Sequence, residues 1–339
     1  MPRKTRIDAP GAIHHVIVRG IERSPIFKDD RDRNQFINRL GALLQETSTA
    51  CYAWALMGNH VHLLLRSGLS PLSLLMRRLL TGYAQYFNRR HSRSGHLFQN
   101  RYKSFLCEEE PYLLELIRYI HLNPVRVGII KSMDELAKFP WSGHSALLGK
   151  HKREWQETGF VLHLFHEKQT AARNAYASFV QKGIVIGRRP DLIGGGLVRS
   201  AGGWVAVQSL RRTKERFASD ERILGSSDFV TAVLKQANEQ YEKKQLLHTF
   251  DIGTLITVVC GHLHVDRALL LSPVKQRQVS RARSLISHIA FTTLRLKGVD
   301  IARSLGLSPA AVTKLAARGR SDPLREEIER KLLEGDMIA

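Results

Sequence analysis

Cysteine is scarce in this 339-residue chain, which has only Cys51, Cys107 and Cys260. So few, in odd number and far apart, argue against a disulfide framework and against a zinc site built from thiolates. The pattern is typical of a protein that works in a reducing cytosol. We therefore expect a cytoplasmic protein.

Long apolar runs are also absent. No stretch of about 18 apolar residues occurs, so we expect no transmembrane helix. The basic start, residues 1–6, leads into Asp8 without an apolar core of signal-peptide length, and we expect no secretion signal. Since neither an amphipathic nor a lipidated anchor is recognisable, no membrane partner is expected.

Acidic residues are few compared with basic ones. The chain has 31 Asp and Glu against 52 Lys and Arg, which gives a formal charge of +21 and a pI of about 10.3. An excess of this size attracts polyanions, so DNA or RNA is the expected partner. With a cytoplasmic location, this predicts a nucleoid-associated protein.

The length favours two or three domains. We expect a first domain over residues 1–150, a helical and glycine-rich connecting region over 151–220 and an α-helical domain over 221–339. The glycines between 187 and 203 lack the lysine of a phosphate-binding loop, so they predict a turn or linker.

Apolar periodicity in the first 150 residues predicts alternating strands and helices. The expected elements are strand 13–18, helix 29–45, strands 51–57 and 60–65, helix 71–89 and strand 95–106. This order is that of a ferredoxin-like antiparallel sheet in an α+β fold. A further helix follows and should end near Leu122, because a residue before proline avoids the helical conformation. Helices are also expected over 155–185, 227–237, 246–259 and 277–296.

Two histidines, His60 and His62, lie one residue apart within an apolar strand. Side chains at i and i+2 of a strand share a face, so the two imidazoles can act as a pair of metal ligands. A half-exposed strand that happens to carry two histidines is the alternative. A second pair, His262 and His264, has no partner at a recognisable spacing and is expected to be structural.

A tyrosine and an amide follow on the expected helix before Pro124. Tyr119 and Asn123 are four residues apart and therefore face the same way, with Tyr112 two turns earlier. A divalent cation held by two imidazoles and an amide oxygen keeps positions open for phosphate oxygens. A tyrosine hydroxyl can then attack the phosphodiester and form a phosphotyrosine.

Between these motifs the chain is basic and contains several aromatic residues. Arginine and lysine there are candidates for phosphate contacts, and the basic arm before residue 7 could lie in a groove of DNA. The aromatic residues could stack on unpaired bases, although packing is the expected role for most of them. The candidate DNA-binding cations are Arg3, Lys4, Arg6, Arg77, Arg78, Arg89, Arg90, Arg93, Arg101 and Lys103; the aromatic residues are Tyr83, Tyr86, Phe87 and Phe98.

Residues 299–316 have the pattern of a helix-turn-helix. Gly306 suits the turn, Ser308 and Pro309 suit the start of the second helix, and Val312 is placed to enter the core. Docked in the usual way, the second helix faces a major groove and its end lies near phosphates. The contacts expected are Pro309, Ala310, Thr313 and Lys314 to the groove and Arg318 and Arg320 to phosphates. A helical hairpin used only for packing is the alternative.

Three motifs in order resemble the REP-associated tyrosine transposases. They are His60-Val-His62 with its leucines, the segment 95–104, and Arg118-Tyr-Ile-His-Leu-Asn-Pro-Val-Arg126. This family is related to the IS200/IS605 single-tyrosine transposases of the HUH endonuclease superfamily. The resemblance covers about residues 1–150, and a weaker one, at residues 220–320, is to the duplex-binding domain of the replication initiator DnaA.

The resemblance implies a metal-dependent DNA strand-cleaving and strand-joining enzyme that uses Mg²⁺ or Mn²⁺. It implies that His60 and His62 bind the metal, that Tyr119 is the nucleophile rather than Tyr112, and that Asn123 completes the metal site. At that position the insertion-sequence enzymes more often have glutamine, which reaches further. The implied substrate is single-stranded or hairpin DNA, cut to leave a 5′-phosphotyrosine and a free 3′-hydroxyl, with duplex DNA bound by the C-terminal domain.

Two other functions are compatible with the sequence. The chain could be a non-catalytic DNA-binding regulator that works through its helix-turn-helix, or a single-stranded RNA-binding protein. The oligomeric state is open, with a monomer favoured over a dimer.

Overall fold

The computed structural model describes residues 7, 11–68, 70–187, 192, 220–274 and 276–334. The chain divides into two compact units, Met1–Val233 and Leu234–Ala339. Three of the cations proposed above, Arg3, Lys4 and Arg6, and most of the glycine-rich stretch lie outside the described residues. Within them, no helix is both long and apolar enough to cross a membrane.

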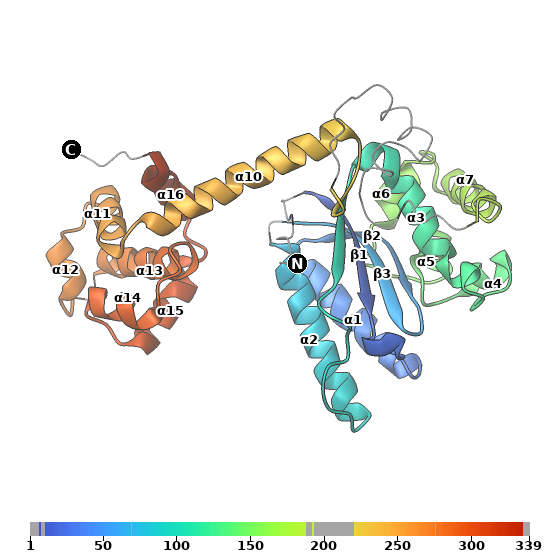
Figure 1. Ribbon diagram of the computed structural model, residues 1–339, viewed down its shortest axis with the longest axis horizontal. Coiled ribbons are helices and arrows are strands. Elements are labelled where there is room, and N and C mark those ends of the chain that lie inside the picture. Colours follow the sequence, from blue (N-terminus) through green and yellow to red (C-terminus); the bar gives the residue numbers. More distant parts are fainter. Residues whose placement is uncertain are drawn as a thin grey trace. The chain divides into compact units, whose positions relative to one another are not determined.

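The first unit is built on a five-stranded sheet in the order β2-β3-β1-β4-β5 (Figure 1). The first four strands are antiparallel, as the ferredoxin-like prediction requires. The fifth, short strand pairs in parallel with β4, so the sheet is mixed. The strands are β1 (Ile13–Arg19), β2 (Ala50–Leu56), β3 (His60–Arg66), β4 (Lys103–Cys107) and β5 (Ile223–Leu224).

Helices cover both faces of this sheet (Figure 1). Val16, Val61 and Leu63 pack with α1 (Asp30–Glu46) and α2 (Leu72–Arg90) on one face. The opposite face packs with α3 (Glu109–Arg126) and α7 (Gln169–Lys182). Both interfaces follow from the period of two in the strands and the apolar stripes of the helices. The remaining elements of this unit are η1 (Ile21–Arg23), α4 (Met133–Lys138), α5 (Gly143–Leu147) and α6 (Thr158–His163).

The turn between β2 and β3 fixes the register of the histidine pair. The Met57 amide donates to the His60 carbonyl at 2.8 Å, which makes Gly58-Asn59 a two-residue turn. Neither turn residue has a positive φ. The register places His60 opposite Arg19 and His62 opposite Ile17. Both imidazoles therefore belong to the face that α3 covers.

The strand predicted over 95–106 is wrong in its first half. Only Lys103–Cys107 is a strand, and residues 95–102 form a loop in which Gly95 and Asn100 have positive φ. Side chains attach this loop to α2, since Asn88 Nδ2 donates to the Gly95 carbonyl at 2.8 Å. The alternating pattern alone did not reveal these side-chain bonds.

The predicted end of the helix before Pro124 is also wrong. The helix α3 includes Pro124 and ends at Arg126, because proline in a last turn removes only one backbone hydrogen bond. The Pro124 carbonyl accepts the amides of Ile129 and Ile130 and so anchors the following loop. As a result, Asn123 lies inside the helix, one turn beyond Tyr119.

A buried carboxylate joins α1 to the end of α2. The side chain of Asp32 is fully buried and accepts hydrogen bonds from the Lys28 amide, the Arg90 guanidinium and His91 Nε2. The Arg90 guanidinium also pairs with Asp29. Arg90, one of the cations proposed for DNA contacts, is thus already paired with two aspartates of the fold.

We expect Asp32→Asn to lower the free energy of unfolding of this unit by about 3 kcal/mol. Removing the charge of Asp32 leaves the Arg90 guanidinium without its buried partner. The expected loss is at the low end of the usual range of about 3–5 kcal/mol because Arg90 still pairs with Asp29. The matched control is Asp30→Asn, whose carboxylate is 71% exposed and pairs with Arg33; a loss below about 1 kcal/mol is expected. Urea unfolding followed by circular dichroism measures both, and equal losses would contradict the prediction.

The second unit is helical, as predicted, and the helix α10 (Ser227–Thr249) leads into it. The single helix expected over 246–259 is wrong, because α10 ends at Thr249 and Asp251 caps a new helix by accepting from the Thr254 amide. Likewise, 155–185 forms the two helices α6 and α7. The other helices of the unit are α11 (Ile252–Leu263), α12 (Arg267–Leu271), α13 (Arg277–Thr292), α14 (Gly298–Leu305), α15 (Pro309–Gly319) and α16 (Arg325–Glu334).

The segment predicted to be a helix-turn-helix forms two helices, α14 and α15, with a turn at Gly306 between them. Gly306 has φ of 62°, and Ser308 Oγ accepts from the Ala311 amide at 3.2 Å to start the second helix. Val312 is buried in the core of this unit. The four groove candidates of α15, Pro309, Ala310, Thr313 and Lys314, are exposed, as are Arg318 and Arg320.

Candidate active site

The histidine pair lies at the end of β3 next to the turn. The rings of His60 and His62 are 5.1 Å apart between centroids and stand nearly perpendicular. Burial lowers the pKa of His60 to about 4, assisted by the nearby Arg19 guanidinium. Burial also lowers the pKa of His62 well below its usual value, with His15, His60 and Arg19 adding to the effect. Both imidazoles are therefore neutral at physiological pH, the form that binds metals.

The hydrogen bonds of His60 define which ring nitrogen carries the proton. Asn59 Nδ2 donates to the Arg23 carbonyl at 2.8 Å, which turns Asn59 Oδ1 toward His60. That oxygen lies 2.7 Å from His60 Nδ1 and can only accept, so Nδ1 carries the proton. The lone pair of His60 is then on Nε2, where it can serve a metal.

The second imidazole has a partner that sequence reasoning missed. His15 Nε2 lies 3.0 Å from His62 Nδ1, and the two rings stack with 5.2 Å between centroids. His15 is fully buried, and burial lowers its pKa to about 4. If His62 Nδ1 donates to His15, the lone pair of His62 is on Nε2 as well. The period of two in β1 places His14 and His15 on opposite faces, and this alternation is the sequence signal that could have identified His15.

The phenol of Tyr119 lies beside this histidine cluster. Its ring is 5.9 Å from His62 and 6.0 Å from His15, and it meets both edge to face. The guanidinium of Arg126 lies over the Tyr119 ring at 5.3 Å and donates to the Tyr119 carbonyl at 3.4 Å. It also reaches the Gly183 carbonyl at the end of α7. Arg126 therefore holds the tyrosine ring against the sheet, a role that its sequence position alone did not indicate.

Asn123 is on the same face of α3, one turn after Tyr119, and its side chain is buried. The amide nitrogen has no hydrogen-bond partner among the described residues, so the amide is not tied to another side chain through that atom. No group of three His, Cys, Asp or Glu that could hold a metal occurs in the described part of the chain. A cation bound by His60 and His62 thus needs another kind of third ligand, and an amide oxygen fits.

The proposed DNA-contacting cations fall into two groups. Arg77, Arg89, Arg101 and Lys103 are exposed. Arg78 pairs with Glu46, Arg90 pairs with the aspartates of α1, and Arg93 donates to Asn88 and His96. Arg78, Arg90 and Arg93 thus already form ion pairs or hydrogen bonds with neighbouring residues. Tyr83 and Phe87 are buried in the core, while Tyr86 and Phe98 are partly buried against it.

Comparison with known proteins agrees with these motifs. Residues 10–123 match the model of the family described as "Transposase IS200 like", a range that contains His60, His62, Tyr119 and Asn123. No curated protein matches the chain.

One matching solved structure is described as "Structure of the REP associates tyrosine transposase bound to a REP hairpin". It is 16% identical, the match covers 46% of this chain and 98% of that one, and the TM-score is 0.37. Over residues 10–123 the chain is therefore similar to the IS200-like transposase family.

Proposed function

We propose that the chain is a single-tyrosine DNA nicking and joining enzyme in which Tyr119 is the nucleophile. The observation that supports this proposal best is the position of the Tyr119 ring, edge-on to His62 and His15. The Tyr119 oxygen forms a bond to phosphorus and the bond from phosphorus to the 3′-oxygen breaks. The phenolic proton is lost and the 3′-oxygen takes up a proton, which leaves a 5′-phosphotyrosine and a 3′-hydroxyl.

His60, His62 and Asn123 would hold a divalent cation, Mg²⁺ or Mn²⁺. When bound there, the cation would supply charge stabilisation to the phosphate oxygens. The protein residues do the rest: Arg126 keeps the phenol oriented, and the exposed Arg19 beside His60 can bind a phosphate oxygen. Reversal of the same step, with a new 3′-hydroxyl as attacking group, would rejoin the strand.

The proposed substrate is DNA with a hairpin and a flanking single strand; the matching structure is described as bound to a REP hairpin. The net charge of +21 supports a polyanionic substrate. In the second unit, the exposed residues of α15, including Arg318, would bind duplex DNA. We further propose that the protein is associated with the nucleoid.

The direct test is covalent capture. The whole chain is incubated with a hairpin oligonucleotide labelled at either end and Mn²⁺, and the products are separated under denaturing conditions. A protein–DNA adduct that retains only the 3′-side label supports the proposed polarity. Stable binding without any adduct, with Mg²⁺ as with Mn²⁺, would favour a DNA-binding regulator instead.

His15 provides a prediction about metal affinity. We expect His15→Ala to weaken Mn²⁺ binding by about 10- to 100-fold, because it removes the hydrogen-bond partner that orients His62. Titration calorimetry with Mn²⁺ measures the affinity directly. The matched control is His14→Ala, one residue earlier on the opposite face of β1, where Nδ1 contacts Ser104. Equal affinities in the His15 variant and the wild type would contradict the proposed role.

A further inference from the structure

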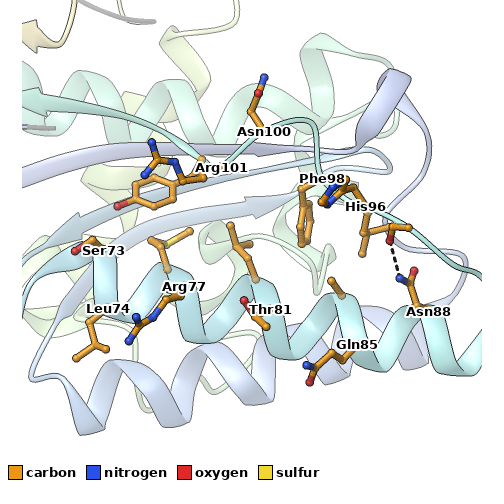
Figure 2. A pocket seen from close by; sticks show the side chains of 16 residues that line it. Ser73, Leu74, Arg77, Thr81, Gln85, Asn88, His96, Phe98, Asn100 and Arg101 are labelled. Atoms are coloured by element: carbon orange, nitrogen blue, oxygen red, sulfur yellow. Dashed lines mark hydrogen bonds between the residues drawn. The ribbon is translucent and has the colours of Figure 1, made fainter. Parts of the chain in front are cut away.

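A groove runs between α2 and the loop 95–102, on the sheet face opposite α3. Its volume is about 620 Å³, within the range of roughly 300–1,000 Å³ typical of small-ligand sites. Figure 2 shows Thr81 and Gln85 along the helix and Phe98 projecting from the loop toward it. None of this space is used by the site described above.

Side chains of α2 and the loop itself shape the groove. Asn88 Nδ2 donates to the Gly95 carbonyl (Figure 2). Arg93 Nη2 donates to the His96 carbonyl at 2.8 Å. Arg93 also donates to Asn88 Oδ1 at 3.2 Å. These bonds fix the loop to the end of α2, so the groove between them belongs to the fold.

The floor of the groove is apolar and the rim is polar. Met76, Leu80 and Leu97 are buried beneath it, and Phe98 is partly buried. An apolar floor with an aromatic ring suits a flat, weakly polar group such as a nucleobase. The rim supplies donors and acceptors from Thr81, Gln85, Asn88 and Asn100.

The charged side chains that line the groove are all basic. None of its lining residues is acidic, and two of them, Arg77 and Arg101, are exposed arginines. Among the described residues neither forms an ion pair. The sequence has no Asp or Glu between Arg66 and Glu108. The resulting positive electrostatic potential of the groove favours a ligand with phosphate groups over an apolar peptide or a cation.

The wall of the groove is connected to the histidine pair by backbone pairing. The Gln99 amide donates to the Arg19 carbonyl at 2.8 Å, and the Ile21 amide donates to the Leu97 carbonyl. Arg19 in turn is opposite His60 in the sheet. Two strand spacings, about 10 Å, therefore separate the backbone of Gln99 from that of His60.

We propose that this groove binds an unpaired nucleotide of the single DNA strand that flanks the cleavage point. The base lies against Phe98 and Leu80, and the adjacent phosphates bind Arg77 and Arg101. The inference rests on the proposed function for its substrate. A paired and stacked base does not offer its face to such a floor, so the groove selects single-stranded over duplex DNA.

Affinity is measured by fluorescence anisotropy on the whole chain with labelled oligothymidylate, in EDTA and with excess unlabelled duplex present. We expect Thr81→Trp, which fills the groove from an exposed position, to weaken oligothymidylate binding by about 10-fold or more. The double variant Arg77→Gln, Arg101→Gln should weaken it similarly and reduce the salt dependence by about 1.4 in log–log slope. Circular dichroism checks that both variants are folded.

A matched control removes two exposed lysines of the same unit, away from the groove. Lys131→Gln, Lys138→Gln lowers the charge by the same amount and should change oligothymidylate affinity by less than about 3-fold. An equal loss in the two double variants would show that only overall charge matters and would overturn the proposal. Tighter binding of oligouridylate than of oligothymidylate, sensitive to Thr81→Trp, would overturn the assignment to DNA.

The position of the base is tested by photocrosslinking. Oligothymidylate carrying one 5-iodouracil is irradiated with the wild-type protein, which is then digested with trypsin. We expect a crosslink on the peptide 94–101, which contains Phe98, and its loss in Thr81→Trp. Crosslinks confined to other peptides would overturn the proposal. If the wild type crosslinks at this peptide but forms no adduct with hairpin DNA, the proposed function fails and the groove assignment stands.

Discussion

Replacing Tyr119 with phenylalanine will reduce formation of the covalent protein–DNA adduct by more than about 10³-fold. The substitution removes only the hydroxyl, which is the proposed attacking group. The ring contacts with His15 and His62 and the guanidinium of Arg126 over the ring face are retained, because none of them requires the oxygen. The measurement is the initial rate of adduct formation with labelled hairpin DNA at saturating Mn²⁺.

The matched control is Tyr112→Phe, on the same helix and two turns earlier. Tyr112 is partly buried and packs against the core on the α3 side of the sheet. The same change there should leave the rate within about 3-fold of the wild type. Hairpin affinity, measured by anisotropy in EDTA, should be unchanged in both variants. An adduct that persists in Tyr119→Phe and disappears in Tyr112→Phe would transfer the nucleophile to Tyr112.

The sequence predicts the core of the first unit well because its strands and helices have different periods. The alternation in β3 placed His60 and His62 on one face, and the structure has that arrangement, with Val61, Leu63 and Leu65 packed on the other face. The spacing of four placed Tyr119 and Asn123 on one face of α3. Both inferences use only local geometry, which residue order determines.

The partners of these residues could not be predicted in the same way. The contact of His15 with His62 depends on the register between β1 and β3, and the two histidines are 47 residues apart. The contact of Arg126 with the Gly183 carbonyl depends on how α7 packs against α3. The strand β5, with only two residues, is too short for any periodic signal. Such pairings arise from tertiary packing, which overrides local preference.

Replacing His62 with alanine will weaken Mn²⁺ binding by more than about 100-fold, beyond the usual effect of residues that only support a ligand. The adduct rate at a fixed low Mn²⁺ concentration should fall in parallel, since a neutral imidazole is removed from the proposed set of three ligands. Because His62 is buried, His62→Gln serves as a second variant that keeps a polar side chain there.

A substitution in the other histidine pair, His262 and His264, should leave Mn²⁺ affinity unchanged. His262 Nδ1 contacts Lys331 Nζ at 3.1 Å in the second unit, and His262→Ala should bind Mn²⁺ like the wild type. Calorimetric titration of all three variants compares the two pairs, which have the same spacing in sequence. Unchanged affinity in both His62 variants would remove the cation from the proposed site, whereas a loss confined to His262→Ala would move it to the second unit. The distinction rests on surroundings, because only the first pair combines burial, a hydrogen-bonded imidazole and a tyrosine ring nearby.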